Sequence, residues 1–269
     1  MNPQVQQFAD LVAHADGVEA FGEQTIFNLT NEQVEHIVLA EAESVVGYAQ
    51  IDHGSAELAI HPEYRRHGLG GRLLDEVKNR DPQAAIWAHG DLPPAVALAR
   101  SRGLEVTREL LYMRAELTPR PLPAPPEGVM VKSFRVDDAD AWLELNARVF
   151  ADHPEQGRIT REDLRDRMDQ EWFDPDTFWL AWEGSGQLLG YMWVKRLPGS
   201  DTAEIYVLGV APEAQGRGVG KFLTEYAMAQ MHTQGAEAMD LYVEGDNAPA
   251  LATYTAYGFT KAVAHIQYV

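Results

Sequence analysis

The chain has 269 residues, enough for one large domain or two of ordinary size, and its formal net charge is −19. So acidic a chain is unsuited to binding nucleic acid or an anionic membrane, and any anionic ligand must be held by a local positive site. The chain has no cysteine, which excludes disulfides, thiol nucleophiles and cysteine metal sites. Because residues 1–10 lack a signal-peptide pattern and no apolar run could span a bilayer, we expect a cytoplasmic protein.

In the first half of the chain, the sequence predicts secondary structure only after about residue 45. Residues 57–77, ELAIHPEYRRHGLGGRLLDEV, run from an apolar strand-like segment through a Gly-rich turn into an amphipathic helix. Residues 90–104, GDLPPAVALARSRGL, are the second segment of this half that returns later in the chain.

A proline-rich stretch separates the two halves. Residues 117–128, LTPRPLPAPPEG, contain five of the fifteen prolines, so this segment is stiff, extended and poor at pairing in a sheet. We therefore expect a first domain at residues 1–117, a linker at 118–128 and a second domain at 129–269.

The second half reads as alternating strands and helices. Thr160 and Asp163 have the spacing of a capping box, and Gly184-Ser185-Gly186 is a turn between two strands. Strands are expected at residues 129–134, 178–183, 187–196, 203–210, 238–244 and 262–269, and helices at 136–150, 159–169, 218–235 and 248–258. Leading strands with intervening helices predict a layered α/β domain.

The two halves repeat each other. HPEYRRHGLG at residues 61–70 matches APEAQGRGVG at 211–220, and the segment at 90–104 matches GDNAPALATYTAYGF at 245–259. Both matches occur in the same order at a similar offset, and the repeat is too long for a solenoid unit. We interpret the chain as two copies of one domain fold.

The Gly-rich turn at residues 215–220 lies where a strand ends and a helix begins. The first amides of a helix have no intrahelical partner, and with the helix dipole they favour an anion. Arg217 and Lys221 add local positive charge in an acidic chain. The alternative is an ordinary Gly-rich connection; the spacing matches neither the Walker loop nor the dinucleotide fingerprint.

The spacing Gln/Arg-x-x-Gly-x-Gly/Ala after LGV-APE resembles the coenzyme A pyrophosphate loop of the GNAT acetyltransferases. Residues 247–259 resemble the Asn-x-x-Ala-x-x-x-Tyr-x-x-x-Gly-Phe segment of the same family. The resemblance implies two tandem GNAT domains, each with a central mixed sheet flanked by helices, and acetyl-CoA as co-substrate without a metal. It also implies a monomer that takes a small-molecule amine and binds neither nucleic acid nor membrane.

The resemblance assigns the cofactor contacts to two sets of residues. In the second half they are Leu208, Gly209, Val210, Gln215, Gly216, Arg217, Gly218, Val219, Gly220, Lys221, Asn247, Ala248, Pro249, Ala250, Leu251 and Ala252. In the first half, where a second coenzyme A could bind, they are Leu58, Ala59, Ile60, Arg66, His67, Gly68, Leu69, Gly70 and Gly71.

Aligning the repeats suggests that only the second domain is catalytic. Tyr254 falls on Ala99 and Glu204 on Gly54, so the first domain is expected to be structural or a passive coenzyme A binder. By resemblance Glu204 is the base that takes the amine proton and Tyr254 protonates the departing thiolate. The alternatives are an exposed strand-end glutamate and a core tyrosine. Gly209, within an apolar strand, suggests a bulge or a close backbone approach.

The tandem arrangement, with segments such as EAFGEQTIFNL and VFADHPEQGRIT, resembles family members that acetylate the cysteinyl amine of Cys-GlcN-inositol. That resemblance assigns the acceptor contacts to Glu23, Glu155, Lys195, Glu204 and Tyr242. Another amine, such as an amino sugar, an aminoglycoside or a peptide N-terminus, stays open as the acceptor. So does a non-catalytic acyl-CoA-binding regulator.

Overall fold

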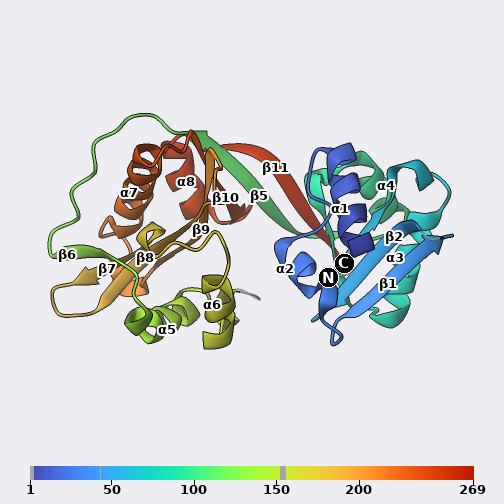
Figure 1. Ribbon diagram of the computed structural model, residues 1–269, viewed down its shortest axis with the longest axis horizontal. Coiled ribbons are helices and arrows are strands. Elements are labelled where there is room, and N and C mark those ends of the chain that lie inside the picture. The colour runs from blue at the N-terminus through green and yellow to red at the C-terminus, as the bar shows by residue number, and fades with distance from the viewer. Residues whose placement is uncertain (1–2, 43, 152–155) are drawn as a thin grey trace. The chain divides into compact units, whose positions relative to one another are not determined.

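The computed structural model describes residues 3–42, 44–151 and 156–269, which form two compact units (Figure 1). The first unit comprises Met1–Leu111, Glu244–Asp246 and Ala262–Val269, and the second comprises Tyr112–Val243 and Asn247–Lys261. Strands β5 (Val106–Glu116) and β11 (Thr260–Tyr268) therefore contribute residues to both units. The linker expected at residues 118–128 contains no helix or strand, and the boundary placed there remains a proposal.

The first unit is built on a mixed sheet. Its strands follow the order β1-β2-β3-β4-β11, with bounds Glu35–Glu41, Ser44–Asp52, Ser55–Ile60 and Ala85–Ala88 for β1 to β4. Strands β3 and β4 are parallel, whereas the pairs β1–β2, β2–β3 and β4–β11 are antiparallel. The last strand of the chain thus pairs with β4, with Ile266 opposite Ala88.

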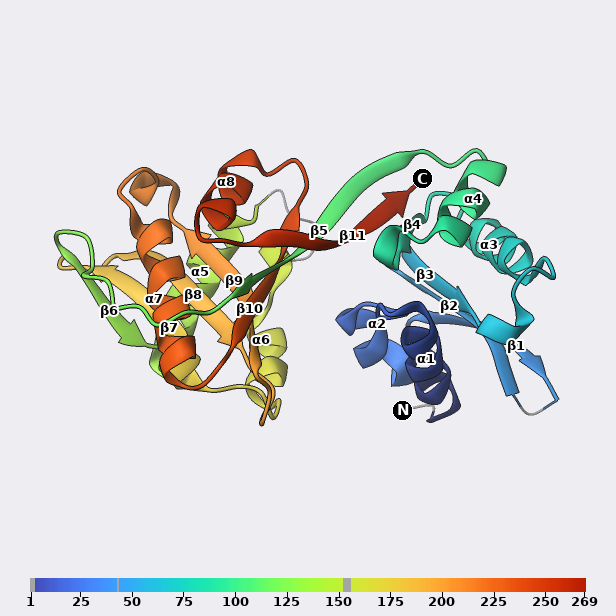
Figure 2. The same ribbon diagram turned by 90° about the horizontal axis from the view of Figure 1, so that it is seen from above.

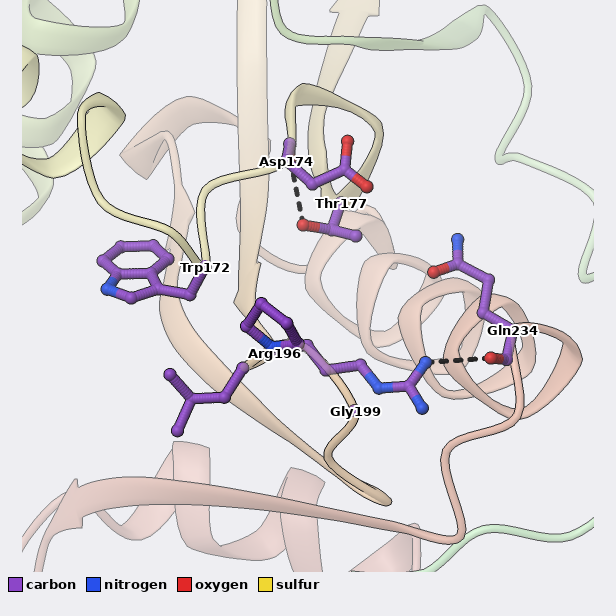
Figure 3. A pocket seen from close by; sticks show the side chains of 8 residues that line it. Trp172, Asp174, Thr177, Arg196, Gly199 and Gln234 are labelled. Carbon is purple, nitrogen blue, oxygen red and sulfur yellow. Dashed lines mark hydrogen bonds between the residues drawn. The ribbon is translucent and has the colours of Figure 1, made fainter.

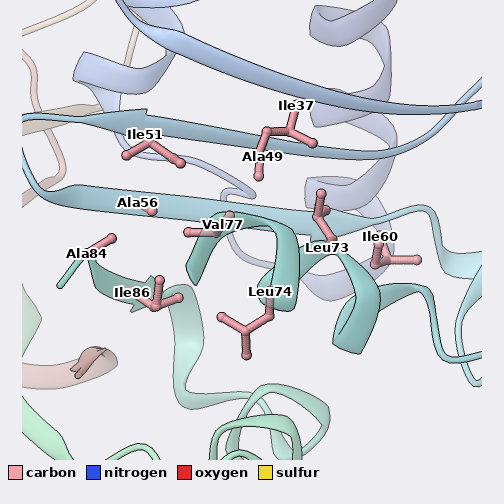
Figure 4. Close-up of a cluster of buried hydrophobic side chains, with 10 residues drawn as sticks. All are labelled: Ile37, Ala49, Ile51, Ala56, Ile60, Leu73, Leu74, Val77, Ala84 and Ile86. Atoms are coloured by element: carbon pink, nitrogen blue, oxygen red, sulfur yellow. The ribbon is translucent and has the colours of Figure 1, made fainter. Parts of the chain in front are cut away.

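Helices cover both faces of this sheet (Figure 2). Helix α1 (Pro3–Asp16), followed by α2 (Glu23–Phe27), buries Val5, Phe8 and Val12 on the face that carries Tyr48. Helix α3 (Leu69–Arg80) lies on the opposite face and packs a second apolar cluster against β1 to β4 (Figure 4). Helix α4 (Pro93–Ser101) follows β4. Apolar residues at helical and at alternating spacing account for both clusters.

The strands of the second unit are also part parallel and part antiparallel. Its strands follow the order β10-β9-β8-β7-β6, with bounds Ala238–Glu244, Thr202–Val210, Leu188–Lys195, Phe178–Glu183 and Val129–Ser133. Strands β9 and β10 are parallel, whereas β6 to β9 are antiparallel. The parallel pair is the place where the site is built.

Helices α5 (Ala139–Val149) and α6 (Arg161–Met168) lie on one side of this sheet and α7 (Val219–Thr233) on the other (Figure 1). On the α5 side, Trp142 meets Phe178, Tyr191 and Trp193 edge-on, with ring centroids 5.6–5.7 Å apart. Such aromatic packing fixes β7 and β8 rigidly beneath the helix. Helix α8 (Ala248–Ala256) follows β10.

The fold class and the elements expected in the second half are confirmed. The capping box of Thr160 and Asp163 is present at the start of α6. Helices α1 and α2 and strand β1 precede residue 45, in the part of the chain where the sequence predicted no elements. No helix in the described part of the chain is long and apolar enough to cross a bilayer.

Candidate active site

The turn from β9 into α7 has the geometry expected of an anion-binding loop. Gly216 and Gly218 have φ angles of 75° and 80°, a left-handed conformation that strains any other residue, and a Cβ at either position would meet nothing within 4 Å. Gly218 is the N-cap of α7, and in the described part of the chain no side chain caps that helix. The amides of its first turn therefore have no side-chain cap among the described residues and are available to a ligand.

Two cationic side chains lie at this loop, one in an ion pair and one exposed. Arg217 contacts Glu183 on β7 at 2.7 Å, and this hydrogen bond lowers the pKa of that carboxyl. Lys221, on the first turn of α7, is exposed. Lys221 can therefore contribute its charge to an anion more directly than Arg217.

The matching loop of the first unit has the same left-handed backbone positions, with Arg66 in place of Gly216. Gly68 is the left-handed N-cap of α3, with φ of 80°, and Arg66 takes the left-handed conformation that Gly216 has in the second unit. Arg65 is held by Asp16 in a two-pronged ion pair at 2.6 and 2.8 Å. The loop conformation is thus kept although the sequence has changed.

Strands β9 and β10 pair over only part of their length. Residues Thr202–Ile205 pair with Ala238–Leu241, and β9 continues to Val210 while it stays paired with β8. Within the described residues, the edge of β9 from Val207 to Val210 does not pair with β10. Leu208, Gly209 and Val210 lie on this open edge, which leads into the loop. In the first unit, β3 likewise pairs with β4 over only part of its length, from Ser55 to Glu57.

A bulge interrupts the pairing of β8 with β9. Trp193 is opposite Val207 whereas Val194 is opposite Ile205, so Tyr206 is the extra residue. Strands β2 and β3 pair without a shift from Gly47 opposite Ile60 to Asp52 opposite Ser55. With the bulge counted, Glu204 corresponds to Ser55 in the first unit instead of Gly54, the match given by the ungapped repeats.

A glycine is needed at residue 209 because the ring of Tyr191 packs closely against it, and not because of the bulge at Tyr206. Gly209 lies opposite Tyr191, and a Cβ on Gly209 would fall 2.5 Å from that ring. Tyr191 is fully buried, and its hydroxyl donates to Asn146 Oδ1 at 2.6 Å. The ring therefore occupies the space that a side chain at residue 209 would need.

Three of the expected acceptor residues lie on one face of the second sheet. Lys195 is directly opposite Glu204, and the Lys195 ammonium lies over the rings of Trp172 and Tyr206 at 5.2 and 5.7 Å. Tyr242 is on β10, where it is 45% exposed. Opposite residues share a face, as do alternate residues of one strand, so Lys195, Glu204 and Tyr242 all point to the α5–α6 side.

Sequence reasoning missed two residues on that face. Asp240 on β10 is directly opposite Glu204, and Tyr112 on β5 donates a hydrogen bond to its Oδ2 at 2.5 Å. The ring of Tyr112 also packs against that of Tyr242, with centroids 5.1 Å apart. The available signal was an aspartate in the apolar strand sequence AMDLYVE, which is unusual unless the side chain has a partner.

Tyr254 is on α8 and is only 7% exposed. Its ring packs edge-on against Phe259, and burial raises the pKa of Tyr254 to about 12. Tyr257 instead donates to the backbone oxygen of Lys221 and to Glu225. Asn247 caps α8, because its side chain accepts a hydrogen bond from the amide of Ala250.

The two remaining acceptor candidates are not placed in this group. Glu155 lies outside the described residues. Glu23 is the first residue of α2 and belongs to the first unit. Their assignments therefore rest on the sequence alone.

The first unit buries a chain of polar side chains that the sequence did not predict. Glu57 on β3 accepts a hydrogen bond from the amide of Gly22 and lies 3.4 Å from His89 Nε2. His89 Nδ1 is 2.8 Å from His265 Nδ1 on β11. Burial opposes the charge on Glu57, but His89 and the Gly22 amide outweigh it and lower the pKa of Glu57. Burial and His89 lower the pKa of His265 to about 4.

His265 makes the stability of the protein sensitive to acid. In the unfolded chain this histidine takes up a proton near pH 6.5, whereas in the folded protein it stays neutral to about pH 4. We therefore expect the free energy of unfolding to fall by about 2 kcal/mol between pH 7 and pH 5 on account of His265. Urea unfolding at both pH values measures it. The free energy of unfolding of His265→Gln should fall less over the same pH range. An equal fall would show that His265 is not the cause of the acid sensitivity.

The described surface of the second unit carries a pocket of about 250 Å³ (Figure 3). Its lining comprises Trp172, Asp174, Thr177, Arg196, Leu197, Pro198, Gly199 and Gln234. Arg196 there donates to the backbone oxygens of Ser200 and Gln234. Neither the Gly-rich loop nor Glu204 nor Tyr254 lines the pocket, so we do not assign the chemistry to it. No group of metal-ligating side chains occurs among the described residues.

Comparison with known proteins matches both halves of the chain to one family. The acetyltransferase (GNAT) family matches residues 141–259, and an acetyltransferase (GNAT) domain matches residues 32–106. The two matches lie on either side of the proline-rich stretch.

Relatives of known name match nearly the whole chain. The mycothiol acetyltransferase of Beutenbergia cavernae is 44% identical over 98% of this chain and 94% of its own, and that of Catenulispora acidiphila is 40% identical over 98% and 93%. Among solved structures, a GCN5-related N-acetyltransferase from Sphaerobacter thermophilus has a TM-score of 0.75 at 22% identity, covering 98% of this chain and 90% of its own. A tandem GNAT protein from the clavulanic acid pathway has a TM-score of 0.74 at 18% identity, covering 99% and 94%.

Proposed function

The chain belongs to the mycothiol acetyltransferases, a tandem-domain group of the GNAT family, and from this premise we propose that it acetylates the cysteinyl amine of Cys-GlcN-inositol. The chain is an acetyl-CoA-dependent acyltransferase of mycothiol biosynthesis. The proposed acceptor makes it the enzyme of the final step, whose product is mycothiol. The observation that carries the proposal is the row of Lys195 and Glu204 beside the open edge of β9.

The second unit would hold acetyl-CoA along that open edge. The edge of β9 between Val207 and Val210 that does not pair with β10 offers backbone groups to the pantetheine arm, which would bind there as a further strand would. The loop from Gln215 to Gly220 and the first turn of α7 offer amides to the pyrophosphate, and Lys221 adds a charge. Backbone amides near Gly209 would stabilise the oxyanion that forms as the thioester is attacked.

Glu204 is the proposed base. The acceptor arrives as an ammonium ion and must lose a proton before its nitrogen can attack the thioester carbonyl. Glu204 is half-buried on β9, on the face that carries Lys195 and Tyr242. Glu204 takes one proton of the ammonium directly or through water, and the free amine then forms a bond to the acetyl carbon. The carbon–sulfur bond breaks with the electron pair leaving on sulfur, and the second proton lost by the nitrogen passes to the thiolate or to solvent.

Tyr254 is the proposed partner of the leaving thiolate. With a pKa of about 12, its phenol stays protonated at any physiological pH. A thiol has a pKa near 8.5, so complete transfer of the phenolic proton to the thiolate is uphill. Tyr254 therefore acts chiefly by donating a hydrogen bond while charge develops on sulfur.

We expect Tyr254→Phe to lower kcat about 10- to 100-fold with little change in KM for acetyl-CoA, because the hydrogen bond forms only as sulfur becomes charged. Tyr257→Phe is the matched control, since its hydroxyl is committed to Lys221 and Glu225. Steady-state rates with both substrates varied give the two constants. Full turnover by Tyr254→Phe would remove this role.

The first unit is proposed to be non-catalytic. Its loop keeps the left-handed residues Arg66 and Gly68, so a second coenzyme A bound there is part of the proposal. Ser55 occupies the position of Glu204, and Ala99 that of Tyr254, so the first unit lacks both proposed catalytic side chains. Glu23 and Glu155 remain proposed acceptor contacts.

The acceptor is tested by incubating the protein with acetyl-CoA and Cys-GlcN-inositol, with glucosamine as a second acceptor. The mass of the product must be read as well as free thiol, because the acceptor carries a thiol of its own. We expect acetylation of the cysteinyl compound alone. Acetylation of glucosamine instead would favour another amine as the acceptor, and failure to acetylate any amine would favour a non-catalytic acyl-CoA binder.

A further inference from the structure

Three neighbouring strands of the second unit place charged side chains in one row. Lys195 on β8 is directly opposite Glu204 on β9, and Glu204 is directly opposite Asp240 on β10. Side chains of opposite residues leave the same face of a sheet, with Cβ atoms about 5 Å apart. Glu204 therefore has a cation on one side and a second carboxyl group on the other.

Asp240 is held in place from its far side. It is 6% exposed, and its Oδ2 accepts the hydrogen bond of Tyr112 on β5. Burial raises the pKa of Asp240, whereas Tyr112, Arg114 and Lys195 oppose that rise. Burial and Asp240 raise the pKa of Tyr112 to about 12, so the shared proton stays on the tyrosine. The groups facing Asp240 are thus Tyr112 and Arg114 from β5, Glu204 from β9 and Lys195 from β8.

We propose that Asp240 is a positioning residue for the proposed reaction, whose negative charge offsets the ammonium of Lys195 and keeps Glu204 basic enough to accept the amine proton. A base works best when its affinity for protons suits the working pH. A lysine opposite a glutamate makes that glutamate a weaker base, and a second carboxylate opposite it on the other neighbouring strand restores its strength. Because Asp240 is buried, solvent screens its charge less than that of a surface residue.

The inference rests on the proposed function and is tested on the full chain with acetyl-CoA and Cys-GlcN-inositol. Asp240→Asn keeps the shape of the side chain and an acceptor for Tyr112 while removing the charge. We expect the acidic limb of kcat/KM to move to lower pH by about one unit and the plateau to fall several-fold. Lys195→Met should move the same limb to higher pH, because the opposing charge has gone.

Two variants separate this role from a structural one. Asp240→Glu keeps the charge, and Tyr112→Phe removes only the hydrogen bond, so neither should move the acidic limb to lower pH. Thermal unfolding checks that each variant is folded, and Asp240→Ser replaces Asp240→Asn if the amide is not tolerated. An acidic limb that superimposes on that of the wild type, or rises, overturns the role of Asp240 alone. A wild-type protein that acetylates no amine overturns the proposed function as well.

Discussion

Glu204→Gln is expected to lower kcat/KM about 100- to 1000-fold at pH 7, the largest loss that we expect from a single substitution. Glutamine has nearly the same shape but cannot take the proton of the ammonium, and general base catalysis contributes an effect of about this size. The rate of the variant should rise with pH, because a larger fraction of the acceptor is then already deprotonated in solution and needs no base. Initial rates of acetyl transfer between pH 6 and pH 10 measure both effects.

Glu162→Gln is the matched control for this substitution. Glu162 is exposed on α6 of the same unit, so its charge can be removed without touching the proposed site. We expect an unchanged rate. The Glu204 variant also tests the division of labour between the units: full turnover with an unaltered KM for the acceptor would contradict the base role and direct attention to the first unit.

Gly209→Ala is expected to lower the free energy of unfolding by roughly 3 kcal/mol, at the upper end of what overpacking usually costs. The added Cβ would fall 2.5 Å from two ring carbons of Tyr191. That ring is fully buried, and its hydroxyl is tied to Asn146, so it cannot swing aside cheaply. Urea unfolding monitored by tryptophan fluorescence gives the value.

Gly184→Ala is the control, because a Cβ there meets nothing within 4 Å and the turn is exposed. We expect a change below about 0.5 kcal/mol for this variant. Tyr191→Leu should make Gly209→Ala less costly, a coupling that a double-mutant cycle detects. Equal stability of the two alanine variants would show that Tyr191 does not explain the glycine.

The local signals in the sequence were sufficient for the elements expected in the second half of the chain, but they did not predict strand β5, which contributes residues to both units. Apolar runs bounded by Gly and Pro placed its strands, and Thr160 with Asp163 placed the start of α6. The left-handed glycines of the loop follow from its spacing. What the sequence did not contain is register: the bulge at Tyr206 depends on packing between β8 and β9, and it changed which residue matches Glu204.

The parts of the site that sequence reasoning missed are contacts between distant segments. Tyr112 and Asp240 are 128 residues apart, and the signal on each side is a single polar residue in an apolar strand. Glu57, His89 and His265 form a buried chain from three separate strands and loops. Spacing along one sequence cannot reveal such partners, since any polar residue has many possible ones.

The pairing of β11 with β4 has a consequence for how the protein is made. His89 and His265 are 176 residues apart, yet they meet inside the first unit. At roughly 5–20 residues per second, a ribosome needs about 10–35 s to travel from one to the other. Throughout that interval the emerging first unit has an unpaired strand edge at β4, which is a template for misassociation. Its folding must therefore be completed after residues 262–269 have been synthesised, even though most of its sequence emerges first.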